Sequence, residues 1–197
     1  MAEWNVVAKA RRDFANLLDG LSAEQLAAQS LCEEWSNLDV AGHLVSLVDM
    51  STASWAKGYV KHRNNLDGYI SDVAKEFAQQ GAPQLAQTLR ANAAKKMRPY
   101  TEASMVNDTA VHFLDVVRPL GLDVALDREV LVLALDSAIG EFTKKSNAPA
   151  VRFVADDVEW SAGQGAEITG PGEAILLALN DRDPSNALDG PGVSLLS

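Results

Sequence analysis

The chain has 197 residues, of which 47% are hydrophobic and 22% are charged, and these proportions are ordinary for a folded protein with a buried core. It carries 17 Lys and Arg against 27 Asp and Glu, a formal net charge of -10, which argues against a protein that tracks nucleic-acid phosphates or docks on anionic lipid. Cys32 is the single cysteine, so the chain has no internal disulfide, and we expect a reducing, cytoplasmic location. No long apolar run predicts a signal peptide or a membrane span.

Apolar residues recur at helical spacing through the first three quarters of the chain. Ser22 and Gln25 predict a capped turn after the first helix, and Ser36 or Asn37 is expected to cap the second. The predicted long helices span residues 3–18, 38–61, 67–96 (interrupted at 81–83), 102–117 and 127–143. Long helices with short connections predict an antiparallel four-helix bundle over residues 1–146.

The last fifty residues have a different pattern, with more glycine and proline and shorter apolar runs. Strands are predicted at residues 151–154, 158–161 and 166–169, followed by a helix at 173–179 that begins after Gly170-Pro171-Gly172. So short a segment cannot bury a large core alone. We therefore predict a small α+β domain over residues 147–197 that packs on the bundle, in a protein that is mainly α.

The predicted helix 102–117 is apolar except for a narrow arc. At about 100° per residue, Asp108, His112 and Asp115 fall within an arc of about 60°. Asp108 and His112 are four residues apart and so lie on successive turns of one face. A buried helix tolerates ionisable groups when they are paired or bind a metal. The spacing therefore indicates a carboxylate and an imidazole that bind one cation.

His43 is the candidate third ligand, because it shares an inward face of the second helix with Val40 and Leu47. Two histidines and one carboxylate from facing helices leave coordination positions open, as in catalytic metal sites. The third histidine, His62, lies in a polar run and is expected to be an exposed loop residue.

Other interpretations of these residues stay open. A histidine on an apolar helix is more often a hydrogen-bonded core residue, and Asp108 would then simply pair with His112. The arc would face water if the opposite stripe, formed by Val106, Ala110, Phe113 and Val117, is the buried one. Two histidines and a carboxylate also suit non-haem iron(II). Arg182 follows a helix end and is placed either at the surface or beside a substrate carboxylate. Cys32 precedes two glutamates, which disfavours a nucleophilic thiol.

Three parts of the chain carry a family resemblance: residues 33–44, residues 108–121 and the C-terminal tail. Together they extend over nearly the whole chain, in the order expected for the family. Residues 33–44, EEWSNLDVAGHL, resemble the opening of the DinB-like bundle proteins. Residues 108–121, DTAVHFLDVVRPLG, are similar to a segment of the actinobacterial mycothiol-dependent maleylpyruvate isomerase group. The tail of the chain is similar to the small C-terminal domain of that group, at DVEWS (157–161), GPGEA (170–174) and LDGPG (188–192).

The resemblance implies a DinB-like bundle that binds a divalent metal, typically zinc, through His43, Asp108 and His112. Members often have glutamate where Asp108 stands. A C-terminal arginine is linked to catalysis in the isomerase, and Arg182 is the matching position. The resemblance also implies mycothiol as the thiol cosubstrate.

We therefore expect a metal-dependent thiol transferase or isomerase that takes a small-molecule thiol and an electrophilic substrate. Asp115 would accept a hydrogen bond from the His112 nitrogen that does not bind the metal, and so fix the tautomer of the imidazole. The alternatives are a non-catalytic metal-binding or regulatory bundle, and a bundle whose ancestral site is empty.

Overall fold

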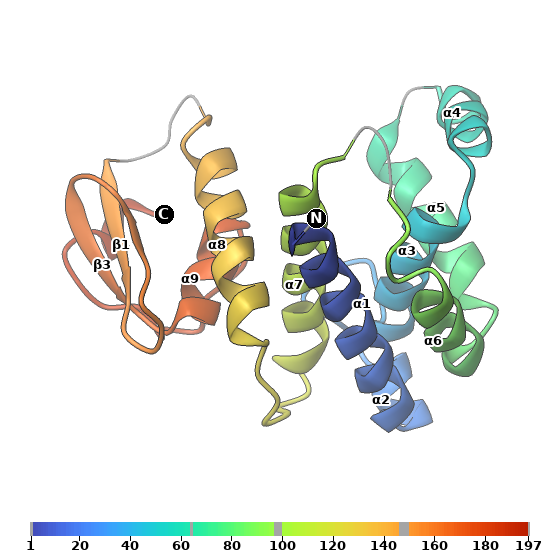
Figure 1. Ribbon diagram of the computed structural model, residues 1–197, viewed down its shortest axis with the longest axis horizontal. Coiled ribbons are helices and arrows are strands. Elements are labelled where there is room, and N and C mark those ends of the chain that lie inside the picture. The colour runs from blue at the N-terminus through green and yellow to red at the C-terminus, as the bar shows by residue number, and fades with distance from the viewer. Residues whose placement is uncertain (1, 64, 97–99, 146–149, 197) are drawn as a thin grey trace. The chain divides into compact units, whose positions relative to one another are not determined.

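A computed structural model describes residues 2–63, 65–96, 100–145 and 150–196 (Figure 1). The chain forms two compact units. The first comprises residues 1–101 and 115–124, and the second comprises residues 102–114 and 125–197. Helix α7 (Glu102–Val117) is continuous, so the chain passes from the second unit into the first within this helix.

The first unit is helical. Besides the last turn of α7, its helices are α1 (Ala2–Gly20), α2 (Ala23–Ala27), α3 (Asn37–Asp49), α4 (Thr52–Lys61), α5 (Leu66–Ala78) and α6 (Ala82–Ala91). Ser22 and Ser36 each form a capping box, with Gln25 and Asp39 respectively. The predicted single helix over 38–61 is wrong: the backbone is extended at Met50, and the Ser51 hydroxyl accepts a hydrogen bond from Ser54 N and so begins α4.

Close helix crossings hold the first unit together. Helix α3 packs against α5 and α6, and α1 packs against α6. Gly42 allows the first of these contacts, because a Cβ at this position would overlap the Ala74 carbonyl and lie 2.8 Å from Ala78 N. The residue next to Gly42 is His43, so this crossing also sets the position of one candidate ligand.

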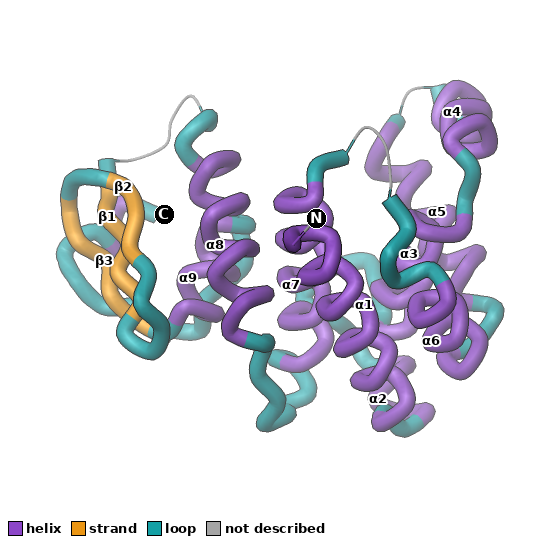
Figure 2. The backbone as a smooth tube through the Cα atoms, viewed as in Figure 1, coloured by secondary structure: helices purple, strands orange, loops and turns teal. Residues whose placement is uncertain are grey.

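The second unit combines helices with a small sheet. Its elements after α7 are α8 (Arg128–Phe142), β1 (Val151–Ala155), β2 (Ser161–Gly163), β3 (Ala166–Gly170), α9 (Gly172–Leu179) and the short 3-10 helix η1 (Val193–Leu195). The strand order is β2-β1-β3, with β1 antiparallel to β2 and parallel to β3 (Figure 2). Phe153 and Ile168 face each other in register and are both fully buried. Helix α9 packs against α8 and β1.

The predicted strand at 158–161 is wrong at its start. Trp160 N donates to the Val158 carbonyl, and Ala155 N donates to the Trp160 carbonyl, so these residues form a tight turn and pairing begins only at Ser161. The mainly α fold class with a small C-terminal sheet is confirmed. The predicted domain boundary at 146/147 lies outside the described residues. Within the described ranges, no helix is long and apolar enough to cross a lipid bilayer.

Candidate metal centre

Helix α7 presents Asp108 and His112 from the second unit. The helix buries most of its apolar residues, and His112 is only 7% exposed, while Asp108 is partly buried. The interpretation in which this arc faces water is therefore wrong. The opposite apolar stripe is buried as well, so α7 is buried nearly all round.

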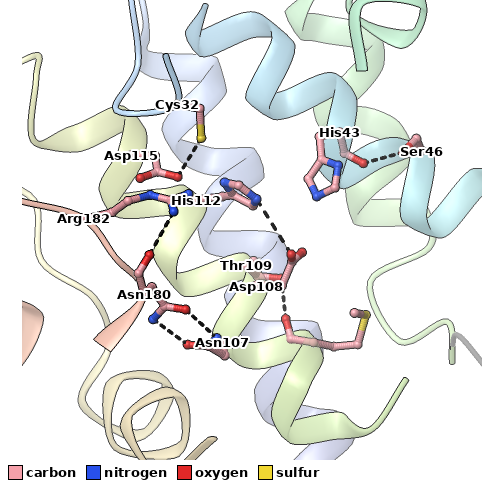
Figure 3. A network of polar contacts seen from close by, with 11 residues as sticks. Cys32, His43, Ser46, Asn107, Asp108, Thr109, His112, Asp115, Asn180 and Arg182 are labelled. Atoms are coloured by element: carbon pink, nitrogen blue, oxygen red, sulfur yellow. Dashed lines mark hydrogen bonds and ion pairs between the residues drawn. The ribbon is translucent and has the colours of Figure 1, made fainter. Parts of the chain in front are cut away.

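The Asp108 carboxylate and the His112 imidazole point toward each other (Figure 3). The distance from His112 Nε2 to Asp108 Oδ1 is 3.8 Å, which is too long for a hydrogen bond. Two ligands of a tetrahedral cation with bonds of about 2.1 Å would lie about 3.4 Å apart. A small side-chain movement thus suffices for both atoms to bind one cation, and the donor set of one nitrogen and one oxygen suits a divalent metal.

His43 belongs to the first unit and is also 7% exposed. Its ring lies against Trp35, with ring centroids 5.1 Å apart, and Trp35 Nε1 donates to Ser71 Oγ at 3.2 Å. The Ser46 hydroxyl donates to the His43 carbonyl at 2.7 Å (Figure 3). The capping box at Ser36 fixes where α3 begins, and Trp35 immediately before it limits how the His43 ring can turn.

Asp115 lies in the last turn of α7, within the first unit, and is fully buried. Cys32 Sγ donates to Asp115 Oδ2 at 3.1 Å (Figure 3). Leu31 N donates to the Asp115 carbonyl at 3.0 Å. The sequence predicted Asp115 as a partner of His112 and gave no sign of the thiol, because Cys32 is 83 residues away along the chain. Only the tertiary structure pairs them.

Arg182 belongs to the second unit, with Asp108 and His112. Its Nη1 donates to the Asn180 carbonyl at 3.0 Å. The Asn180 and Asn107 side-chain amides are hydrogen-bonded to each other in both directions (Figure 3). Sequence reasoning missed both asparagines. In the sequence, Asn180 follows the last apolar residue of a predicted helix, and Asn107 precedes Asp108. Neither position indicates that the two asparagines contact each other.

Comparisons with known proteins agree with this architecture. Residues 7–120 match the family described as the mycothiol maleylpyruvate isomerase N-terminal domain. A solved structure of a mycothiol-dependent maleylpyruvate isomerase is similar over 96% of this chain and 92% of that chain, at 13% identity and a TM-score of 0.55. A histidine-to-alanine mutant of a mycothiol-dependent maleylpyruvate isomerase aligns over the same shares, at 11% identity and a TM-score of 0.49.

No curated protein matches the sequence. At 13% identity the structural match shows a shared fold and no more. The family match covers more than half of the chain and includes His43, Asp108, His112 and Asp115. The chain therefore belongs to the mycothiol maleylpyruvate isomerase N-terminal domain family.

Proposed function

We propose that this protein is a divalent-metal-dependent transferase or isomerase that uses a small-molecule thiol, with mycothiol as the thiol, and acts on a small electrophilic substrate. The observation that carries the proposal is the pair formed by the buried His112 and the partly buried Asp108, with its 3.8 Å separation, on a helix of the family's domain. The substrate class is proposed from the family, whose description names a mycothiol maleylpyruvate isomerase.

His43, Asp108 and His112 would hold the cation. Two imidazoles and one carboxylate are a ligand set that zinc takes in catalytic sites, with a further position left for another ligand. A divalent cation held there would lower the pKa of a thiol that coordinates it and so supply a thiolate at neutral pH. Iron(II) accepts the same ligand set, so elemental analysis decides between the two metals.

The chain's own thiol does not serve as the nucleophile in this proposal. Cys32 Sγ donates a hydrogen bond to the buried Asp115 carboxylate, so this thiol is already engaged within the protein. The reacting thiol therefore arrives on the cosubstrate. Arg182 would bind a carboxylate of the electrophile, since a guanidinium forms paired, charge-assisted hydrogen bonds with that group. Asp115, one turn beyond His112 on α7, would help to fix the orientation of the imidazole.

The experiment is metal analysis of the purified protein, followed by a thiol-conjugation assay before and after dialysis against a chelator. We expect about one divalent cation per chain, loss of activity without it, and recovery on adding zinc. His43→Ala, Asp108→Asn and His112→Ala should each weaken binding by about 10-fold or more. His62→Ala is the matched control, because it removes a histidine outside the proposed ligand set.

Three outcomes separate the candidate functions. Metal binding with metal-dependent thiol transfer supports the proposal. Stoichiometric metal without turnover of any electrophile would instead indicate a non-catalytic metal-binding or regulatory protein. Activity that is indifferent to the chelator and to His112→Ala would reject the metal-dependent reaction.

A further inference from the structure

The chain reverses direction sharply where α9 ends, immediately before Arg182. Asp181 N donates to the Ala178 carbonyl at 3.2 Å, and Arg182 N donates to the Leu177 carbonyl at 2.9 Å. These two bonds define a Schellman motif, in which the residue after the C-cap adopts a left-handed conformation. The backbone of Arg182 is thereby tied to the last turns of α9.

The left-handed residue in this motif is an aspartate. Asp181 has φ +59, a conformation that glycine adopts without strain and that is unfavourable for most other residues. Both of its carboxylate oxygens accept hydrogen bonds from Lys145 Nζ, at 2.7 and 2.6 Å. A side-chain anchor from beyond the end of α8 therefore accompanies the strained turn.

Asn180, the C-cap of α9, connects this turn to α7. Its Nδ2 donates to the Leu176 carbonyl at 2.8 Å and to Asn107 Oδ1 at 3.2 Å. Asn107 Nδ2 donates back to Asn180 Oδ1 at 2.9 Å. The main-chain carbonyl of the same Asn180 accepts from Arg182 Nη1 at 3.0 Å. One residue thus holds the guanidinium and also binds the neighbour of Asp108.

We propose that Asn107 and Asn180 are positioning residues for Arg182: their paired amides hold the end of α9 at a fixed place along α7, and the Asn180 carbonyl then directs the guanidinium. The consequence for substrate, which rests on the proposed function, is selectivity for electrophiles that carry a carboxylate. All the contacts that support this assignment lie within the second unit. A reciprocal amide pair suits this positioning role, because each side chain is both donor and acceptor. Both hydrogen bonds form together only when the end of α9 lies at one position along α7.

The first test does not depend on activity. Arginine side-chain NMR signals are recorded for the full chain, and the Arg182 signals are assigned by their loss in Arg182→Lys. We expect resolved, slowly exchanging Nη protons in the parent protein and their broadening in Asn180→Ala, Asn107→Ala and the isosteric Asn107→Asp. The matched control is Asn92→Ala, because Asn92 caps α6 and donates to the Thr88 carbonyl in the same local geometry, in the first unit.

The second test measures selectivity. We compare kcat/KM for a carboxylate-bearing electrophile with kcat/KM for its methyl ester. The ratio of the two should fall by about 10-fold in Asn107→Asp and Asn180→Ala, because kcat/KM falls for the acid and stays unchanged for the ester. In an Arg182→Ala background, Asn107→Asp should change the ratio no further.

The outcomes keep the two proposals apart. Unchanged Arg182 signals in both Asn107 variants would overturn the positioning role, whatever the activity. Additive effects of Asn107→Asp and Arg182→Ala on the ratio would overturn it as well. If the parent protein transfers no thiol, the proposed function fails, and the NMR measurement alone decides the role of the asparagines.

Discussion

At the scale of single residues, His62 lies between two hydrogen-bond acceptors. Its Nδ1 faces the Gly58 carbonyl at 2.9 Å and its Nε2 faces Asp72 Oδ2 at 3.0 Å, so both ring nitrogens meet acceptors. Only the doubly protonated imidazolium donates to both. His62 is the C-cap of α4 and lies in the turn after that helix, so the predicted loop position is confirmed, whereas its side chain is only partly exposed, at 29%. The Gly58 carbonyl, and then Asp72, raise the pKa of His62 above 6.5, against the opposing effects of burial and of Lys61.

The raised pKa of His62 predicts a direction for stability against pH. A group whose folded-state pKa is raised stabilises the fold fully below its unfolded pKa, about 6.5, and loses that effect as pH rises through the folded value. The difference in unfolding free energy between the parent and His62→Gln should therefore be larger at about pH 5.5 than at about pH 8.5. NMR titration of the imidazole checks the cause: Asp72→Asn should lower the pKa of His62 only in part, because the larger effect of the Gly58 carbonyl remains. A parent pKa at or below 6.5 would contradict the assignment.

Arg11 supports a second residue-scale prediction. Its guanidinium is buried, and Nη1 donates to the carbonyls of Ala93 and Lys95, at 2.9 and 2.8 Å, just beyond the end of α6. Arg11→Met keeps most of the aliphatic stem but removes these donors, so it should cost about 1–3 kcal/mol of unfolding free energy. Urea denaturation measures the loss. Arg12→Met, at the exposed neighbouring position, should stay within about 0.5 kcal/mol, and equal effects at both positions would contradict the argument.

At the scale of elements, the contact between α3 and α5 depends on one missing side chain. Glycine within a helix ordinarily costs up to about 1 kcal/mol relative to alanine, so Gly→Ala is expected to stabilise where there is room. At Gly42 there is none, because the α5 backbone at Ala74 and Ala78 occupies that space. The sequence showed an inward-facing helix here but not how closely its partner approaches.

Gly42→Ala should therefore destabilise the protein by about 1–3 kcal/mol, because α3 must move away from α5. Gly140→Ala is the matched control: Gly140 lies in α8, and no atom lies within 4 Å of the Cβ that would be added. It should gain about 0.5–1 kcal/mol. Thermal unfolding of both variants checks the pair. Of the two variants, only Gly42→Ala should also lose metal affinity, since His43 follows Gly42 directly. A Gly42→Ala protein that unfolds at the same temperature as the parent would contradict the packing argument.

Helix ends were predictable where a polar side chain caps them, as at Ser22, Ser36 and Asp127. They were missed where the apolar pattern continued across a break. Residues 38–61 keep helical spacing, and the extended backbone at Met50 together with the hydrogen bond from Ser54 N to the Ser51 hydroxyl separates α3 from α4.

At the scale of the whole molecule, the proposed ligand His43 is far from Asp108 and His112 in the sequence, so only the folded chain would bind the cation tightly. A ligand that binds the folded state alone stabilises it by about 2.7 kcal/mol at 100 times its dissociation constant. Zinc should therefore raise the Tm of the chelator-treated protein. The Tm of His112→Ala should change little or not at all when zinc is added. An equal shift in His112→Ala and in the parent would place the cation elsewhere.

The fold class, most helix positions and the Asp108–His112 pair could be predicted from the sequence, because helical periodicity, capping residues and i,i+4 spacing are local properties of the chain. Family membership agrees with the resemblance carried by residues 33–44 and 108–121. The tertiary structure alone decided that α7 buries its polar arc, that Cys32 meets Asp115 and that Asn107 meets Asn180. These contacts join segments more than seventy residues apart. Such contacts depend on how helices pack, and a one-dimensional pattern does not record that packing.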